Sequence, residues 1–558
     1  MDLDSVIRKH VLKNIHDYGK ANPGSVIGKV IGEFPDAKND VKSAMKKINE
    51  EIARASKLSK EQIEEEMKGF KYAVKEEKEK TITLPNAVEG KVVTRFPPEP
   101  SGYLHVGHAK AAWINFEGAN SHGGYMVLRI DDTNPEKESQ EYVDAAKESL
   151  KWLGINWEKE THTSDKMEEI YKAAEKLIEK NKAYVCTAKQ EEIRESRTSG
   201  KPCADRKLPA EEHLKRWKDM LDGKYKPGEA VLLFKGDLKA NNTTLRDPNL
   251  ARIIETNHYR KHNQYRVWPG YDLAVVVMDN IEGITHSMRS KEYELRDELY
   301  RQICAALELK VPEIVGYSRL QIKNAPISKR LITPLVKEKK VSGWDDPRLP
   351  TLAGLRRRGI LPEAIKQFVL YFGLSKTESE PDWEVLLAFN RKLLDPESPH
   401  YFFVPDPVAL ELEGMDKEIT LKLHPKKDLG TRKLKAARTI YVPKSDAEKL
   451  KDGEIFRLKD LCNVELLKKG EKLKGKIAPE EKHPQKKIQW VSDYAECTVI
   501  VPKDLLKDGE YNPESLEEIR GYCEKSCTAL GEGTMVQFER FGFCRLDKKD
   551  PLTFIFSC

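Results

Sequence analysis

The sequence lacks any uninterrupted apolar run of about 18 residues, the length that a membrane-spanning helix needs. Its first residues, Met1 to Ser5, also lack the order of basic, apolar and small residues that marks a signal peptide. No internal repeat is visible. With 39% hydrophobic and 34% charged residues, the chain is expected to be a globular protein of the cytosol with no membrane partner.

Cysteine is scarce and scattered. The chain has nine cysteines, an odd number, and its size argues against a disulfide scaffold. Cys186 and Cys203 have no second close pair, and Cys523 and Cys527 have no histidine near them in the sequence. Because a structural zinc site usually needs about four such ligands, buried or surface thiols are the favoured interpretation, and no resident metal is predicted.

Charge of one sign is not in large excess, since the net charge is only +6. That value alone does not indicate a nucleic-acid partner. The basic residues are nevertheless uneven, because one segment holds eight of them with the single acid Asp428. The eight are Lys422, Lys426, Lys427, Arg432, Lys433, Lys435, Arg438 and Lys444. Such a run usually forms a solvated face, and RNA contact is the alternative.

The chain of 558 residues is too long for one hydrophobic core, and at about 150 residues per domain three to five domains are expected. Residues 1 to about 80 show helical spacing, with Ser25 as a candidate cap of a second helix and a charged, mobile linker at the end. Strands are predicted at 92–96 and 125–131, and helices from His105 to Gly123 and from Lys137 to Leu153. This order is typical of an open parallel α/β sheet.

Later segments change character several times. Residues 183–268 break the α/β rhythm with Gly, Asn and Pro turns, and they are interpreted as an insertion. The apolar run at 273–278 is predicted to be a strand buried on both faces, and another strand is expected at 317–322. Residues 343–390 are helical in pattern, and short strands with turns follow from about 392 to the end.

One turn with two histidines has the residue types of a phosphate site. It covers residues 98–108, PEPSGYLHVGH, between the first strand and the first helix of the α/β segment. Ligands of open α/β sheets bind beyond the carboxyl ends of strands, and a helix N-terminus there offers free N–H groups to phosphate. Gly102 and Gly107 would let the backbone approach a bulky ligand. His105 and His108 are predicted to donate hydrogen bonds to phosphate as charge develops, although two such histidines can also simply pack on a helix.

A second candidate phosphate contact is the tripeptide Ser328, Lys329 and Arg330, about 220 residues after the first motif. Lys329, on a mobile loop, is predicted to close over β- and γ-phosphates and to stabilise departing pyrophosphate. Alone, this tripeptide is more typical of a solvated surface loop. Its position after the second half of the α/β segment is what favours a phosphate contact.

Together the two motifs resemble the signatures of class I aminoacyl-tRNA synthetases. The first has Val106 where that family often has isoleucine, a mild change. The second has Pro326 where the usual leading lysine would stand, which puts one phosphate contact in question. The resemblance implies that ATP is a substrate, together with Mg²⁺.

Other segments resemble the glutamyl/glutaminyl subgroup of that family, and the match runs from about residue 90 to the C-terminus. They are RFPPEPSG at 95–102, LRIDDTNP at 128–135, GITHS at 283–287, GWDDPR at 343–348 and GLRRRG at 354–359. The strand-rich tail is similar to the β-barrels of the archaeal/eukaryotic type. Bacterial glutamyl enzymes have a helical domain there instead.

The resemblance implies a multidomain fold around an α/β Rossmann-type catalytic core. The implied parts are an N-terminal helical module and linker (1–85), two core halves (90–182 and 269–335), an inserted acceptor-end-binding domain (183–268), a helical connector (336–391) and anticodon-binding β-barrels (392–558). In that setting the basic run at 422–444 becomes a better candidate for RNA contact. The N-terminal module could touch the tRNA body, dock a partner protein or be purely structural.

Arg289 favours glutamate over glutamine as the amino acid. A guanidinium forms a bidentate pair with a carboxylate that an amide cannot match, and by resemblance glutamyl enzymes carry arginine at this position where glutaminyl enzymes have a small uncharged residue. The resemblance also places Arg95 against the amino acid, Asp131 beside its ammonium group and Tyr271 in the pocket wall. Without the resemblance, Arg289 would be interpreted as a helix-surface arginine.

The reaction that the resemblance implies has two steps. The glutamate α-carboxylate attacks the α-phosphate of ATP, and the 2′-hydroxyl of the terminal tRNA adenosine then attacks the glutamyl-adenylate. His105, His108 and Lys329 stabilise phosphate charge, and positioning and electrostatics do most of the catalysis. Bound tRNA is expected to be needed for adenylate formation. The partner is tRNA(Glu), with tRNA(Gln) as a further candidate, and a monomer is expected.

Three other functions stay open. A glutaminyl-tRNA synthetase is the nearest alternative. A small-molecule nucleotidyltransferase could use the same histidine turn, but it would need neither the insertion nor the barrels. A non-catalytic RNA-binding scaffold would have no use for the histidines and Lys329. No motif identifies the residues that read the anticodon.

Overall fold

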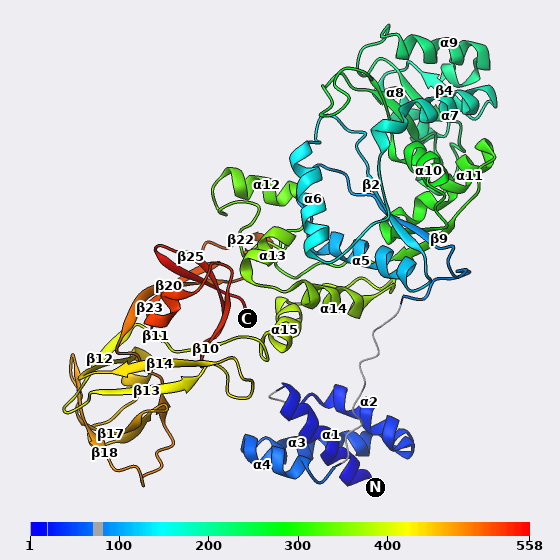
Figure 1. Cartoon of the computed structure of the whole chain (residues 1–558). Helices are drawn as coiled ribbons and strands as arrows, with labels where there is room; N and C mark the ends of the chain where they lie inside the picture. Colours follow the sequence, from blue (N-terminus) through cyan, green and yellow to red (C-terminus); the bar gives the residue numbers. More distant parts are fainter. Residues whose placement is uncertain (1, 19–20, 71–81) are drawn as a thin grey trace. The chain divides into compact units, whose positions relative to one another are not determined.

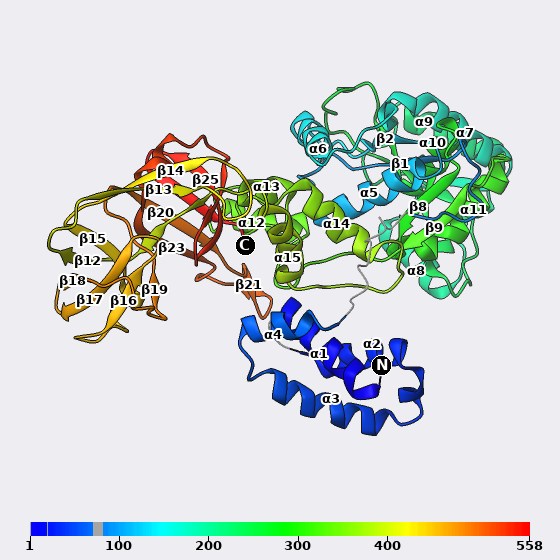
Figure 2. The ribbon, with the colours of Figure 1, turned by 60° about the horizontal axis from the view of Figure 1, so that its bottom comes forward.

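The computed structural model describes residues 2–18, 21–70 and 82–558 (Figures 1 and 2). The chain divides into two compact units, one before and one after the boundary between residues 79 and 80. The charged linker predicted at the end of the helical module falls on residues 71–81, outside the described residues. Within the described ranges, no helix is both long and apolar enough to cross a membrane.

The N-terminal unit is helical, as its periodicity predicts. Its elements are α1 (Leu3–Tyr18), α2 (Pro23–Glu33), the 3₁₀ turn η1 (Pro35–Lys38), α3 (Val41–Ala55) and α4 (Lys60–Met67). Their apolar faces share a core that includes Val11, Leu12, Val26, Val30 and Ile48. Asn22 rather than Ser25 caps α2, because its side-chain oxygen accepts the Gly24 N–H at 2.9 Å. Pro23 then begins the helix, where its missing N–H is no loss.

The second unit contains a parallel sheet in two parts. Strands β1 (Val93–Phe96), β2 (Tyr125–Ile130) and β3 (Lys159–His162) pair in parallel in that order, and β8 (His286–Ser290) pairs in parallel with β9 (Glu313–Tyr317). The Thr285 N–H donates to the Val93 carbonyl at 3.0 Å, which sets the start of β8 beside the start of β1. The carboxyl ends of the strands therefore meet at one edge, where open α/β sheets hold their ligands.

The helices of this core are α5 (Val106–Asn120), α6 (Gln140–Trp152), α7 (Met167–Glu179), α10 (Tyr271–Ile281) and α11 (Asp297–Leu307). The predicted strands at 92–96 and 125–131 and the predicted helices from His105 and Lys137 are confirmed. Gly154 follows α6 with φ +76°, a backbone conformation that suits glycine.

Two predicted strands are wrong. Residues 273–278 lie within helix α10. Residues 272–279 are all buried, so no polar face interrupts the apolar run, and periodicity alone cannot separate a buried helix from a buried strand. The strand expected at 317–322 is also misplaced, because β9 ends at Tyr317 and the chain beyond it is irregular.

The segment between the two halves folds into an antiparallel sheet with helices. The order is β4 (Ala183–Cys186), β5 (Val231–Phe234), β6 (Asn249–Ile253) and β7 (Val267–Pro269), accompanied by α8 (Gln190–Ser199) and α9 (Ala210–Leu221). Buried Trp217, Leu232 and Trp268 share a core with α7, α10 and α11. This shared core fixes the inserted sheet against the second half of the parallel sheet.

Helices follow the parallel sheet, and then strands, as predicted. The helices are α12 (Lys329–Lys337), α13 (Leu352–Arg358), α14 (Pro362–Phe372) and α15 (Trp383–Leu394). A six-stranded sheet comprises β15 (Thr439–Pro443), β12 (Pro407–Leu412), β18 (Leu473–Ala478), β17 (Cys462–Lys468), β16 (Ile455–Leu458) and β19 (Lys487–Ile488), in that order.

A seven-stranded sheet completes the chain (Figure 2). In spatial order it comprises β10 (His400–Tyr401), β24 (Met535–Phe538), β25 (Gly542–Lys549), β26 (Leu552–Phe556), β20 (Tyr494–Pro502), β23 (Leu516–Glu524) and β11 (Phe403–Pro405). Two hairpins accompany the sheets, β13 (Lys417–Lys422) with β14 (Thr431–Ala436) and β21 (Leu506–Lys507) with β22 (Glu510–Tyr511). Beside the second hairpin, Leu505 packs on Ile332 and Leu335 of α12, so a strand-rich segment contacts the helix that starts at Lys329.

Candidate active site

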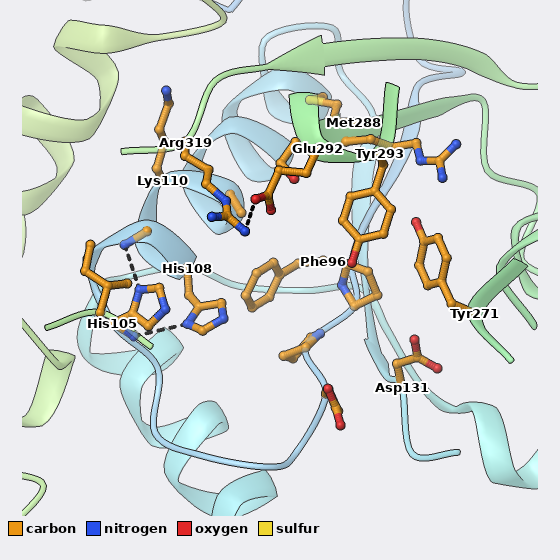
Figure 3. Close-up of a pocket in the computed structure, with 18 of the residues that line it drawn as sticks. Phe96, His105, His108, Lys110, Asp131, Tyr271, Met288, Glu292, Tyr293 and Arg319 are labelled. Carbon is orange, nitrogen blue, oxygen red and sulfur yellow. Dashed lines mark hydrogen bonds and ion pairs between the residues drawn. The ribbon is translucent and has the colours of Figure 1, made fainter. Parts of the chain in front are cut away.

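A cavity of about 830 Å³ opens at the carboxyl edge of the parallel sheet. Eight of the eleven residues predicted for the site line it: Arg95, His105, Gly107, His108, Asp131, Tyr271, Arg289 and Ser328. Gly102, Lys329 and Arg330 are not part of its lining. Figure 3 shows the two histidines on one side of the cavity and Asp131 and Tyr271 on the other, with Phe96 between them. The cavity thus has two chemically different ends.

The histidine end is built by the first turn of α5. His105 is the N-cap of α5, and its ring lies 3.9 Å from the ring of His108, centroid to centroid. The Gly107 N–H donates to Nδ1 of His105 at 3.1 Å, and the His105 N–H donates to Nδ1 of His108 at 3.2 Å. Since each Nδ1 accepts, the proton of each neutral ring sits on Nε2. Both rings can therefore donate a hydrogen bond from Nε2.

The surroundings keep both rings neutral near pH 7. Burial lowers the pKa of His108 to about 4. Burial, together with the neighbouring His108 and Arg319, lowers the pKa of His105 well below its ordinary value. The pair is therefore a set of neutral donors rather than a pair of cations.

The prediction of free N–H groups at the start of α5 is wrong. The Val106 N–H donates to the Pro350 carbonyl at 3.0 Å, and the Gly107 N–H is bound to the His105 ring. Gly107 is needed for the same reason, because a Cβ there would lie 2.9 Å from Cε1 of His105. Glycine at 107 makes room for the histidine ring, and the donors that remain at this end of the cavity are the two rings.

Arg289 stands at the other end of the cavity on strand β8, not on a helix surface. It is only 4% exposed, and its Cζ lies 5.4–5.6 Å from the ring centroids of Tyr271, Tyr293 and Tyr300. Nη1 donates to Asp297 at 2.8 Å. Nε and Nη2 are buried and have no hydrogen-bond partner among the described residues. These two unpaired donors lie on the same edge of the guanidinium, so both can donate to the two oxygens of one carboxylate.

Arg95 is buried beneath this end and already has partners. Its Nε donates to Asp279 at 3.1 Å, Nη1 to the Met288 carbonyl at 2.9 Å and Nη2 to the Ser287 hydroxyl at 2.8 Å. Arg95 therefore joins β1 to β8 and α10 while it also lines the cavity. A buried charge needs such partners. Arg95 therefore has a structural role that does not depend on contact with a ligand.

Asp131 follows β2 directly and faces the same space as Tyr271 (Figure 3). The Thr163 hydroxyl donates to its carboxylate at 3.2 Å. Burial is the main effect that raises its pKa to about 6, with Arg129 and Thr163 opposing the rise. The ammonium group of a bound amino acid would favour the ionised carboxylate.

The second motif borders the cavity and is less of a loop than predicted. Ser328 is the N-cap of α12, and Lys329 and Arg330 already belong to that helix. Nζ of Lys329 donates to the Ser101 carbonyl and lies 5.0 Å from the ring centroid of Tyr142. Lys329 thus contacts the first motif, although it does not line the cavity. Pro326 is buried.

Sequence reasoning missed several residues of the lining. Arg319 lies two residues past the end of β9 and forms an ion pair with Glu292 across the cavity (Figure 3). Lys110 is fully buried on α5, and its Nζ donates to the Ser318 carbonyl at 2.8 Å. The rule that ligands gather at strand carboxyl ends would have found Arg319, had the end of β9 been placed correctly. The sequence does not indicate that Lys110 is buried, because a lysine on a helix is normally expected to be exposed.

A second cavity of about 550 Å³ lies between the inserted sheet and the start of α10. Four arginines line it: Arg197, Arg246, Arg252 and Arg296. Arg252 is an exposed residue of β6 and lines the first cavity as well. The side of the site that faces the insertion is therefore basic, which suits a polyanion.

The basic run at 422–444 lies on β13, β14 and the segments beside them. Seven of its eight cations are exposed. Arg432 is the exception, because it is buried and donates from Nε to both carboxylate oxygens of Glu524 at 3.0 Å. Contact with RNA stays a prediction for the seven exposed residues. Arg432 has a structural role instead, because its ion pair joins β14 to β23. Across the described ranges, no group of three or more His, Cys, Asp or Glu side chains could hold a metal ion.

Family models match almost the whole second unit. Residues 91–396 match the model described as tRNA synthetases class I (E and Q), catalytic domain. Residues 398–481 and 487–547 match two models described as the anti-codon binding domain of the same synthetases.

Similar proteins extend the match to the full chain. The glutamate–tRNA ligase of Nitrosopumilus maritimus is 44% identical over 559 residues, which cover 98% of each chain. Those of Cenarchaeum symbiosum and Pyrococcus abyssi are 39% and 41% identical and cover 99% and 98% of both partners. The crystal structure of glutamate-tRNA synthetase from Elizabethkingia anophelis has a TM-score of 0.41 and 23% identity over 55% of this chain and 71% of that one, too distant to add to the argument.

The class predicted from the two motifs and the subgroup predicted from the other segments are thereby confirmed. The catalytic-domain match alone covers more than half of the chain, and the three relatives align along nearly all of it. The chain belongs to the class I tRNA synthetases of the glutamyl and glutaminyl (E and Q) family.

Proposed function

We propose that this chain attaches L-glutamate to tRNA through a glutamyl-adenylate made from ATP. The relatives named above are glutamate–tRNA ligases. The observation that carries the choice of amino acid is Arg289, a buried cation whose Nε and Nη2 have no partner among the described residues. A ligand carboxylate would satisfy both groups at once.

Glutamine would fit this end of the cavity poorly. Its amide presents one acceptor oxygen and an NH₂ group, and that NH₂ group would face either Nε or Nη2 of Arg289. A buried donor left unpaired costs about 1–3 kcal/mol, and more when the donor is charged. The same argument makes a site for glutamate reject glutamine by at least about tenfold.

The first step would run along the length of the cavity. With the glutamate side chain at Arg289 and its ammonium group at Asp131, the α-carboxylate points toward the histidine end. ATP enters with Mg²⁺ as part of the substrate. Nε2 of His105 and of His108 then donates to phosphate oxygens as negative charge grows. No side chain need act as a covalent nucleophile in this step, so catalysis rests on positioning and hydrogen bonding.

The second step needs the end of a tRNA at the same place. We assign residues 183–268 to holding the acceptor end, because the arginine-lined cavity leads from this segment to the glutamate end through Arg252. Residues 392–558 would read the anticodon of tRNA(Glu), and tRNA(Gln) is a further candidate. The halves 90–182 and 269–335 carry the chemistry, and 336–391 connects them to the strands. Since tRNA charging serves translation, we expect the chain to act in the cytoplasm. We also expect a monomer, because the resemblance to the subgroup implies one.

A charging assay tests the proposed function. Purified tRNA(Glu) and tRNA(Gln) are each incubated with the chain, ATP, Mg²⁺ and either labelled glutamate or labelled glutamine. We expect labelled glutamate on tRNA(Glu), with the tRNA(Gln) arm showing whether the third anticodon base is discriminated. Exclusive attachment of glutamine would establish the glutaminyl alternative. Failure to charge any tRNA would favour the RNA-binding scaffold, or the small-molecule nucleotidyltransferase if ATP were still consumed.

Asp131 predicts how glutamate use depends on pH. Its pKa is raised to about 6, so below that pH the carboxyl takes up a proton and can no longer pair with the substrate ammonium. The ratio kcat/KM reports the free enzyme, and for glutamate it should fall about tenfold per pH unit below about pH 6. Two other groups of the lining keep their protonation state near pH 6, because burial lowers the pKa of His108 to about 4 and raises that of Glu138 to about 9.

The measurement is kcat/KM for glutamate over roughly pH 5 to 8 at saturating ATP and tRNA. Asp131→Asn is the matched control, since it should be slow and should lose the acid limb. A profile that stays flat below about pH 6 in the unmodified chain would show that Asp131 does not pair with the substrate.

A further inference from the structure

A pair of thiols lies in the inserted segment, one on strand β4 and the other in a connecting loop. All nine cysteines fall within the described ranges, all are free, and eight of them are buried. The exception is Cys203, which is partly exposed. Its Sγ lies 3.6 Å from Sγ of Cys186, the last residue of β4. Neither residue lines either of the cavities described above.

We propose that Cys203 and Cys186 form a reversible dithiol–disulfide couple that is oxidised by a hydroperoxide, with Cys203 as the reacting thiol and Cys186 as the resolving thiol. A disulfide has an S–S distance of about 2.05 Å, so the two sulfurs must close by only about 1.5 Å. Cys203 precedes the 3₁₀ turn η3 (Ala204–Lys207) and lies in a connecting segment, which can make that movement more easily than strand β4.

Exposure decides which thiol reacts first. Cys186 is 0% exposed, so a peroxide in solution cannot reach it directly. Cys203 is partly exposed, and its Sγ also lies 3.8 Å from the Tyr184 hydroxyl. The Cys186 thiol is the main influence on Cys203 and lowers its pKa below the ordinary value of a thiol. The thiolate is the nucleophilic form of cysteine, so the neighbour that later resolves the reaction also prepares it.

The chemistry balances with the hydroperoxide as the only oxidant. The Cys203 thiolate attacks one peroxide oxygen, so that an S–O bond forms, the O–O bond breaks and hydroxide or alkoxide leaves with the electron pair. The product is a sulfenic acid. The Cys186 sulfur then attacks the Cys203 sulfur, the S–S bond forms, and the sulfenic oxygen leaves as water with the thiol proton. Two thiols lose two electrons in total, and the peroxide is reduced.

A metal site explains the proximity of Cys186 and Cys203 less well. Zinc needs about four protein ligands in a structural site. The nearest carboxylate along the chain, Asp205, is already engaged, because it accepts the Thr187 N–H at 2.7 Å and Nη1 of Arg216 at 2.9 Å. No group of three or more metal-ligating side chains occurs anywhere in the part of the chain that the structure describes.

The barrel thiols provide an internal comparison. Cys497, Cys523 and Cys527 also lie in one core, but all three are buried. If proximity alone decided oxidation, they would react as readily as the inserted pair. If access to solvent is required, only the pair that contains Cys203 should form a disulfide in the folded chain.

The test uses the full-length chain, folded and reduced. It is treated with hydrogen peroxide, its remaining thiols are alkylated under denaturing conditions, and the peptides are mapped by mass spectrometry. We expect two of the nine thiols to be lost to alkylation, a linked peptide that joins Cys186 to Cys203, and full reversal by dithiothreitol. Cys186→Ser should abolish the linked peptide and let Cys203 proceed to the sulfinic acid, whereas Cys527→Ser should leave the linked peptide unchanged.

Three results would overturn the proposal. The first is that no thiol is lost, or that Cys203 is oxidised beyond the sulfenic acid in the unmodified chain without forming the link. The second is that a link among the barrel cysteines forms first. The third is stoichiometric zinc in the purified chain that is released when Cys203 is alkylated, which would make the pair a metal site. The unmodified chain decides each of these outcomes, so none depends on a variant that folds poorly.

Discussion

Replacing Arg289 with glutamine should lower kcat/KM for glutamate by a factor on the order of 10² to 10³. Removing one partner of a buried, hydrogen-bonded charge pair costs about 2–5 kcal/mol, and about 1.4 kcal/mol corresponds to a factor of ten. Arg289 meets these conditions, since it is 4% exposed and surrounded by the rings of Tyr271, Tyr293 and Tyr300. In such surroundings little water can replace the lost guanidinium.

The measurement is the steady-state rate of charging against glutamate concentration, at saturating ATP and tRNA. The KM for ATP serves as the internal control, because the histidine end is built by α5 and not by β8, and it should stay within about threefold. Arg289→Lys is the matched variant, since it keeps the charge and loses the side-on geometry. It should recover part of the loss. Unchanged kcat/KM in Arg289→Gln would make Arg289 a structural residue that only pairs with Asp297.

The same residue shows what the sequence could and could not predict. The segment around Arg289 indicates the family and the residue, and only the alternative interpretation, a helix-surface arginine, is wrong. The sequence does not predict the buried strand on which Arg289 stands. A strand of five residues that runs through a core, such as β8, has no periodicity long enough to be read. The three tyrosines come from α10, from the turn after β8 and from α11, so only the folded chain brings them together.

In general, the sequence does not predict which segments that are distant along the chain contact one another. The motif at 98–108 correctly placed His105 and His108 at the start of a helix after a strand. It does not show that Pro350 accepts the Val106 N–H, so the backbone donors expected there are lost, and the ring donors, which the motif also predicts, remain. In the same way, the apolar run within α10 does not show whether this buried segment is a helix or a strand. Patterns fix local structure, whereas the partner of a buried polar group depends on the tertiary fold.

Lys329→Ala should lower kcat by a factor on the order of 10² to 10³ and change the KM for ATP by less than about threefold. In the structure Nζ of Lys329 is held by the Ser101 carbonyl and lies near Tyr142, so the side chain rests on the first motif at the border of the cavity. To reach β- and γ-phosphates it must leave that carbonyl. A contact made mainly as pyrophosphate departs stabilises the transition state and not the bound substrate, and its loss appears in kcat.

Arg330→Ala is the matched control for Lys329→Ala, because it removes a neighbouring cation from the same helix turn. Pro326 leaves this motif with Ser328, Lys329 and Arg330 as polar candidates, and Lys329 donates a hydrogen bond to Ser101 of the first motif. We therefore expect Arg330→Ala to reduce kcat by less than about tenfold. Single-turnover formation of the adenylate with tRNA present separates chemistry from product release. Equal losses in the two variants would mean that the motif supplies general positive charge, and an unaffected Lys329→Ala would remove Lys329 from the mechanism.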